Sequence, residues 1–204
     1  MTSATDDPLV TTDWLAAHID DPKVRVIDAT FKLPGMLPLP VDDYLAAHIP
    51  GAVFFDVDAV ADHGNPNPHM YPDAAQFARD IGALGISTGD TVVAYDSGSW
   101  VAAPRAWWMF LSFGYPNIRV LDGGLKKWTR EGRPTHSGKV VGHDNAGQAI
   151  GIVVCQRDRL FFCIEGTYSD DGSKDLLAHN TTIGVKATKD NRCNPEALLR
   201  RCVW

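Results

Sequence analysis

A loop of small polar residues follows a short apolar run and is the first candidate for chemistry. The run occupies residues 91–95, and the residues after it lead toward Pro104. Backbone N–H groups in such a loop, just before a helix, can point at a bound anion. The same residue types are also good helix caps that bind no ligand. The pattern therefore leaves open a plain capped loop or an anion-binding loop made of Asp96, Ser97, Gly98 and Ser99.

Cysteine is confined to the last third of the chain. Its four copies stand at positions 155, 163, 193 and 202, and their spacings of 8, 30 and 9 match no zinc motif. Cys155 follows the apolar residues 152–154, and Arg157 and Arg159 would lower the pKa of its thiol. The stretch 156–160 lacks the small residues that expose loop N–H groups. Cys155 is thus a candidate nucleophile without a supporting loop.

Three further side chains are candidates for lining a cleft. Asp28 ends the apolar run 24–27, and ligands bind beyond the carboxyl ends of parallel strands. His48 stands in a turn, and histidine is a residue type that can act on a substrate in a cleft. Arg105 is expected on a helix. Each also has a simpler structural role. Asp28 would cap a turn, His48 would bond to backbone, and Arg105 would form a surface salt bridge.

The loop 62–72 holds the residues that suggest a metal. Asp62, His63 and His69 lie in it, without a further ligand at regular spacing. Structural zinc is therefore not expected. The rest of the sequence suggests no cofactor either.

Apolar periodicity alternates between strands and helices over residues 1–140. Strands are expected at 24–27, 53–57, 91–95 and 119–121. Helices are expected at 14–19, capped by Thr12-Asp13, and at 41–47, 73–84, 103–113 and 125–130. Such alternation is typical of an α/β domain with a mainly parallel sheet, in which the run 91–95 is central.

The composition changes near residue 140. Residues 1–140 hold 12 of the 13 prolines and carry 11 Lys+Arg against 17 Asp+Glu, whereas residues 141–204 hold every cysteine and balance 8 charges against 8. We therefore expect a domain at 8–140 and an atypical tail at 141–204, poorly ordered and too short for a second domain of equal size. Within the tail, possible strands are 149–154, 160–164 and 180–186, and a possible short helix is 196–201.

The overall charge and the N-terminus exclude several classes of partner. A net charge of −6 provides no basic surface for nucleic acid. Residues 1–7 do not resemble a secretory signal, and no run approaches the ~20 apolar residues of a membrane-spanning helix. We expect no nucleic-acid or membrane partner and a cytoplasmic location, where cysteines stay reduced.

The turn at 48–51 belongs to a longer motif. Tyr44, three further residues and then His48-Ile49-Pro50-Gly51-Ala52 resemble the N-terminal signature of the rhodanese family. The blocks at 9–15, 24–29, 103–110 and 121–128 resemble the first half of tandem thiosulfate or 3-mercaptopyruvate sulfurtransferases. The resemblance spans residues 8 to 138, about two thirds of the chain.

This resemblance implies a five-stranded parallel sheet flanked by helices, and a reaction that moves a sulfane sulfur onto a loop cysteine. The sulfur then passes to cyanide or another thiol. In tandem members that cysteine belongs to the second domain. Here Asp96, or a close neighbour, stands at the usual cysteine position, and residues 1–140 contain no cysteine. A carboxylate forms no persulfide, and its charge repels an anionic donor.

Three functional interpretations follow. The chain is a sulfurtransferase relative for a small anionic sulfur donor, with little or no activity alone; or an active enzyme that uses Cys155 or a partner chain; or a binding module for an anion or a protein. The tail reads as a truncated or divergent second domain. Without a full second domain, some of Trp100, Trp107 and Trp108 would lie uncovered, which predicts docking of the tail or self-association.

Overall fold

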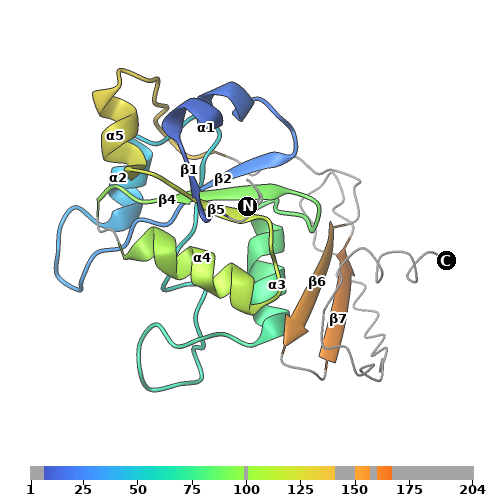
Figure 1. The fold of residues 1–204 in the computed structure, drawn as a ribbon. Coiled ribbons are helices and arrows are strands. Elements are labelled where there is room, and N and C mark those ends of the chain that lie inside the picture. Colours follow the sequence, from blue (N-terminus) through green and yellow to red (C-terminus); the bar gives the residue numbers. More distant parts are fainter. Residues whose placement is uncertain (1–6, 99–100, 141–149, 157–159, 167–204) are drawn as a thin grey trace.

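The computed structural model describes residues 7–98, 101–140, 150–156 and 160–166. Its centre is a five-stranded sheet in the order β1-β5-β4-β2-β3, in which every neighbouring pair is parallel (Figure 1). The strands are β1 (Leu9–Val10), β2 (Val24–Asp28), β3 (Val53–Phe54), β4 (Thr91–Tyr95) and β5 (Ile118–Leu121). The predicted parallel sheet, with 91–95 at its centre and 24–27 beside it, is confirmed.

Helices cover both faces of the sheet (Figure 1). They are α1 (Thr12–His18), α2 (Pro40–Ala46), α3 (Ala74–Ala83), α4 (Ala102–Ser112) and α5 (Gly124–Arg130). Among the described residues, no helix is long and apolar enough to span a membrane.

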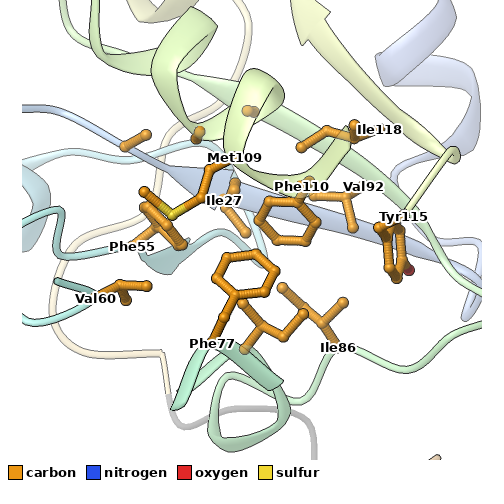
Figure 2. Packing of buried hydrophobic residues seen from close by; sticks show 14 of the residues in the cluster. Ile27, Phe55, Val60, Phe77, Ile86, Val92, Met109, Phe110, Tyr115 and Ile118 are labelled. Atoms are coloured by element: carbon orange, nitrogen blue, oxygen red, sulfur yellow. The ribbon is translucent and has the colours of Figure 1, made fainter. Parts of the chain in front are cut away.

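The alternation of side chains along β4 divides the core in two. Val92 and Ala94 pack with α3 and α4, where Phe77 and Phe110 meet edge to face with ring centroids 5.1 Å apart (Figure 2). Val93 and Tyr95 face the other way and pack with buried residues from α1, α5 and the 48–52 turn. Both faces of β4 are therefore buried, as expected for a central parallel strand.

Most predicted boundaries differ from the observed ones by a residue or two, and two of the differences have a local cause. The cap of α1 is Thr11, whose hydroxyl accepts from the Trp14 N–H at 3.1 Å, because the helix already begins at Thr12. The second predicted strand, 53–57, is only two residues long in the structure, where it is β3. Its continuation turns away because the Asp56 carboxylate accepts the N–H of Asp58 at 2.9 Å, a side-chain bond that competes with sheet pairing.

An antiparallel hairpin follows the parallel domain. It consists of β6 (Ile150–Gln156) and β7 (Leu160–Gly166), which fall on two of the runs expected to be strands. Both strands lie beside α3 (Figure 1). The expected elements at 180–186 and 196–201 lie outside the described residues, and the division of the chain at residue 140 stays a prediction.

The aromatic residues of α4 divide between core and surface. Trp107 packs against the larger core cluster, whereas Trp108 is 52% exposed and meets Tyr71 at a ring distance of 5.4 Å. Trp100 lies outside the described residues. Self-association through such an exposed side chain stays a prediction.

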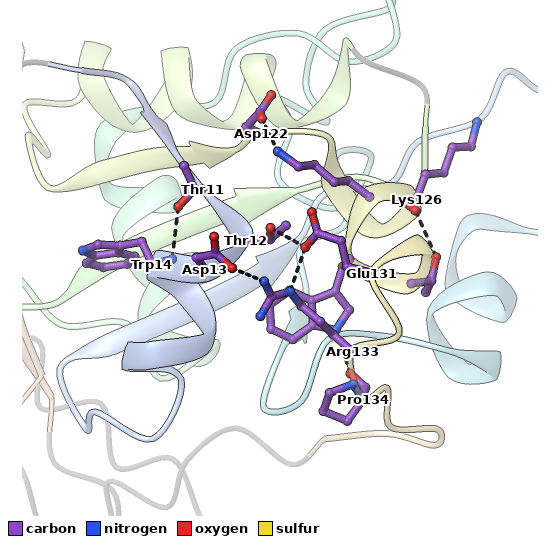
Figure 3. Close-up of polar contacts among 12 residues, drawn as sticks. Thr11, Thr12, Asp13, Trp14, Asp122, Lys126, Glu131, Arg133 and Pro134 are labelled. Carbon is purple, nitrogen blue, oxygen red and sulfur yellow. Dashed lines mark hydrogen bonds and ion pairs between the residues drawn. The ribbon is translucent and has the colours of Figure 1, made fainter.

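A network of polar side chains, here called the Glu131–Arg133 network, connects the end of α5 to α1 (Figure 3). Glu131, just after α5, accepts from the Thr12 hydroxyl at 2.5 Å and from Arg133 at 2.8 Å, and Arg133 also pairs with Asp13. The buried Trp128 donates its indole N–H to the Pro134 carbonyl at 2.7 Å. These contacts fix α5 on the sheet and thereby place its first residues.

Candidate functional site

Two buried carboxylates meet at the carboxyl edge of the sheet, where parallel α/β proteins bind ligands. Asp28 ends β2, and Asp96 follows β4, which pairs with β2 through the register Asp28 to Tyr95. Both side chains are almost fully buried, at 1% and 6% exposure. Buried carboxylates require hydrogen-bond donors, so their partners decide what this edge can do.

Asp28 obtains its donors from the adjacent turn. Its Oδ1 accepts from the Thr30 N–H at 2.9 Å and from the Thr30 hydroxyl at 2.5 Å. Burial raises the pKa of the Asp28 carboxyl, the bonds from Thr30 partly oppose this rise, and the nearby charge of Asp96 adds to it. The Tyr95 hydroxyl also bonds Asp28, and burial raises the pKa of Tyr95 well above its usual value.

The loop after β4 is closed by its own aspartate. Asp96 Oδ1 accepts from the Gly98 N–H at 2.9 Å, and Oδ2 accepts from the Ala103 N–H at 3.2 Å, in the first turn of α4. The Ser97 N–H donates to the Thr30 hydroxyl at 2.9 Å. The expected anion-binding arrangement of free N–H groups is therefore not observed at Ser97 and Gly98, because a resident carboxylate and a hydroxyl accept from them. Ser99 lies outside the described residues.

The start of α5 closes the same loop from the other side. The Leu125 N–H donates to the Asp96 carbonyl oxygen at 3.1 Å. Gly124 has φ +54°, and a Cβ atom on it would lie 2.5 Å from that oxygen, so only glycine permits this approach. Lys126 lies against Gly98, where a Cβ atom would stand 2.3 Å from its Nζ. The Asp96 loop is therefore packed tightly between α4 and α5.

A second cluster lies in the loops after β2 and β3. His69 Nδ1 is 2.5 Å from Oδ1 of Asp58, and the Phe31 ring meets the imidazole edge-on at 5.0 Å. Arg105, on α4, donates through Nη2 to the His69 carbonyl oxygen. The two side chains of the ion pair remain accessible, at 28% for His69 and 63% for Asp58. A carboxylate beside a reachable imidazole is a common arrangement for moving protons.

The sequence reasoning did not find this pair. It considered His69 only with Asp62 and His63 as metal ligands, and it did not consider Asp58. In the structure Asp62 accepts from the Gly64 N–H at 2.9 Å, and His63 Nε2 lies 3.0 Å from the Ala59 carbonyl oxygen. Within the described ranges, no three His, Cys, Asp or Glu side chains gather as metal ligands would. The loop has no periodicity, so no sequence signal pairs Asp58 with His69.

The sequence profile of the rhodanese-like domain matches residues 11–131. The chain belongs to the rhodanese-like family. The 3-mercaptopyruvate sulfurtransferase of Escherichia coli K12 is 45% identical over 159 residues, covering 76% of this chain and 57% of that protein. This match covers more of the chain than the resemblance at residues 8–138, which spans about two thirds of it. Thiosulfate sulfurtransferase of Bos taurus is 43% identical over 136 residues, 63% of this chain and 45% of that protein.

Solved structures agree with the rhodanese fold. The crystal structure of SseA from Escherichia coli, a 3-mercaptopyruvate sulfotransferase, superposes with a TM-score of 0.63 at 43% identity over 66% of this chain and 52% of that one. Tum1 of Saccharomyces cerevisiae gives a TM-score of 0.59 at 28% identity, over 69% of this chain and 47% of that one. The rhodanese-like chain thus spans about half the length of the relatives it matches.

The remaining predicted residues occupy separate places in this rhodanese-like domain. His48 is fully buried, its Nδ1 lies 2.8 Å from the Tyr44 carbonyl oxygen, and its ring stacks on that of Tyr44. It connects to Asp28 only indirectly, since the neighbouring Ile49 N–H donates to the Tyr95 hydroxyl at 3.1 Å. Cys155 lies in β6, and its side chain is outside the described residues. A functional role for any of these residues stays a prediction.

The tight approach of Gly124 to the Asp96 carbonyl predicts a position-specific cost. Gly124→Ala should lose more stability than Gly132→Ala, measured by urea unfolding of the full chain. Both glycines have positive φ, +54° and +69°, so alanine at either pays about 1–2 kcal/mol of backbone strain. At Gly124 the added methyl must also displace the Asp96 carbonyl, whereas nothing lies within 4 Å at Gly132. Equal losses at the two positions would contradict the packing of the Asp96 loop.

The raised pKa of Asp28 predicts a pH dependence of stability. Between its unfolded pKa of about 3.9 and its higher folded pKa, the folded state binds the proton more strongly, so stability falls as pH rises. Asp28→Asn removes this titration. Urea unfolding at several pH values should show the wild type losing up to about 1.4 kcal/mol per pH unit relative to the variant inside that window. A difference that stays constant from pH 4 to 7 would argue against a raised pKa.

Proposed function

We propose that this chain supplies the cysteine-free half of a sulfurtransferase site for a small anionic sulfur donor, 3-mercaptopyruvate or thiosulfate. The cysteine that carries the sulfur would come from outside residues 1–140. The observation that carries the proposal is the Asp96 carboxylate at the end of β4, which accepts two N–H groups of its own loop and helix. Those are the donors that a loop thiolate or persulfide would need.

The chemistry of Asp96 rules it out as the sulfur carrier. A carboxylate oxygen cannot hold a sulfane sulfur as a persulfide. Its negative charge, nearly buried, also disfavours a second anion in the same loop. The same argument disfavours the loop as the anion site of a pure binding module. The family resemblance, in which the second domain provides the cysteine, is consistent with this assignment.

The domain would contribute the Asp58–His69 pair instead. When 3-mercaptopyruvate gives its sulfur to a thiolate, the carbon–sulfur bond breaks and its electrons remain on pyruvate as an enolate. That enolate needs one proton at carbon, which a histidine can donate as a general acid, and Asp58 Oδ1 lies 2.5 Å from His69 Nδ1, where it can orient the ring. Thiosulfate releases sulfite, which needs no such proton. The pair therefore favours 3-mercaptopyruvate as the donor.

The chain alone should not turn over either donor. Thiocyanate formed from cyanide with thiosulfate or 3-mercaptopyruvate should appear no faster with the full chain than with a variant in which all four cysteines are serine. The physical reason is that the loop of the domain contains no thiol. Turnover that disappears in Cys155→Ser, with the fold retained, would assign the sulfur to Cys155 and overturn the proposal.

A chimera tests the contribution of the ion pair. Residues 1–140 would be joined to the second half of the Escherichia coli 3-mercaptopyruvate sulfurtransferase, a protein that this chain matches at 45% identity over 159 residues. His69→Gln or Asp58→Asn should lower kcat with 3-mercaptopyruvate by about 10²–10⁴-fold, the usual value of a positioned proton donor, and should affect thiosulfate much less.

His63→Gln is the matched control, since this exposed histidine of the same loop bonds only the Ala59 carbonyl among the described residues. It should leave both rates unchanged. Equal losses with the two donors in His69→Gln would show that His69 does not serve as the proton donor.

A further inference from the structure

We infer that Arg105 is a positioning residue that holds His69 in the conformation in which its imidazole faces Asp58. The inference deepens the proposed function and rests on it for the role of the ion pair. The contact itself joins two elements that are far apart in sequence, since Arg105 lies on α4 and His69 lies in the loop before α3.

The backbone of His69 is in a conformation that its residue type rarely adopts. Its φ is +57°, and it is the one non-glycine residue with positive φ in the part of the chain that the structure describes. Left-handed conformations cost non-glycine residues free energy and persist where the surroundings impose them. Such outliers often occur at functional sites. Something must therefore hold His69 in place.

The Arg105 guanidinium supplies that restraint on the backbone. Its Nη2 donates to the carbonyl oxygen of His69 itself, so it acts on the peptide group whose orientation is unusual. On the side-chain face, Phe31 packs edge-on at 5.0 Å and Asp58 stands 2.5 Å from Nδ1. Phe31, Asp58 and Arg105 therefore all contact His69, and of these three contacts the one from Arg105 is made to the main chain.

Arg105 is itself held by the Asp96 loop. Its N–H donates to the Val101 carbonyl at 3.1 Å, and two residues earlier the Ala103 N–H donates to the Asp96 carboxylate at 3.2 Å. Asp96 therefore fixes the first turn of α4, and this turn carries the guanidinium to His69. Asp96 therefore affects the Asp58–His69 pair indirectly, through the first turn of α4 and Arg105. Among the described residues, Arg105 makes this contact to backbone and not the surface salt bridge that was the simpler expectation.

NMR on the full chain tests the assignment without any need for sulfur chemistry. Arg105→Met keeps most of the apolar stem and removes the donors. In this variant the backbone ¹³C shifts of His69 should leave the left-handed range, and its ring ¹⁵N signals should move in the direction that Asp58→Asn moves them. Arg105→Lys, which keeps a cationic donor group at the end of the side chain, should restore part of both signals.

Two controls keep the test decisive. Arg130→Met removes an exposed arginine of α5 and should leave the signals of His69 unchanged. The indole N–H of Trp128, bonded to the Pro134 carbonyl, reports whether each variant is folded. If Arg105→Met unfolds the chain, Arg105→Lys and Arg105→Gln carry the test. A folded variant without the guanidinium in which His69 keeps its left-handed shifts and its ring signals would overturn the inference.

This outcome is independent of the proposed function. If His69→Gln does not lower kcat of the chimera, the Asp58–His69 pair has no role in the reaction, and the NMR result on Arg105 still holds. If the NMR signals of His69 do not change in Arg105→Met but His69→Gln lowers kcat of the chimera, only the positioning role of Arg105 is rejected.

Discussion

The bonds of the Asp96 carboxylate are the constraint on which this domain depends. The Asp96 carboxylate, at the end of the central strand, accepts the N–H groups of Gly98 in the loop and of Ala103 in the first turn of α4. The backbone carbonyl of Asp96 accepts the N–H of Leu125, in the first turn of α5. A charge buried to this extent is tolerated only with such partners. The strand, the loop and two helices are therefore joined at a single residue.

The same bonds decide where chemistry can occur. A loop of small residues before a helix ordinarily offers N–H groups to an anion. Here the anion belongs to the chain, so the loop stabilises the fold and has no described N–H group free at Ser97 or Gly98. An accessible ionisable pair is instead formed by Asp58 and His69, in the loop after β3, two strands from β4 in the sheet order. Site and scaffold remain connected, because α4 extends from the Asp96 loop to His69.

The core explains how rigid this connection is. The alternation of β4 places Val92 and Ala94 under α3 and α4, and Val93 and Tyr95 under α1 and α5. Buried aromatic side chains, such as Phe77 against Phe110, fix α4 on its face of the sheet. The Glu131–Arg133 network fixes α5 on the other face of the sheet. A helix packed in this way holds the backbone of Arg105 in a fixed place on the sheet.

The sequence alone determined the α/β architecture, the central strand at 91–95 and the family. These follow from apolar periodicity and from the turn motif at 48–52, which are local in the chain. It also determined that no cysteine lies within residues 1–140. Only the tertiary structure revealed that Asp96 satisfies its own loop, that Asp58 pairs with His69, and that Arg105 bonds a backbone carbonyl. The physical reason is that these contacts depend on how irregular loops close over a packed helix, and neither residue type nor spacing encodes that closure.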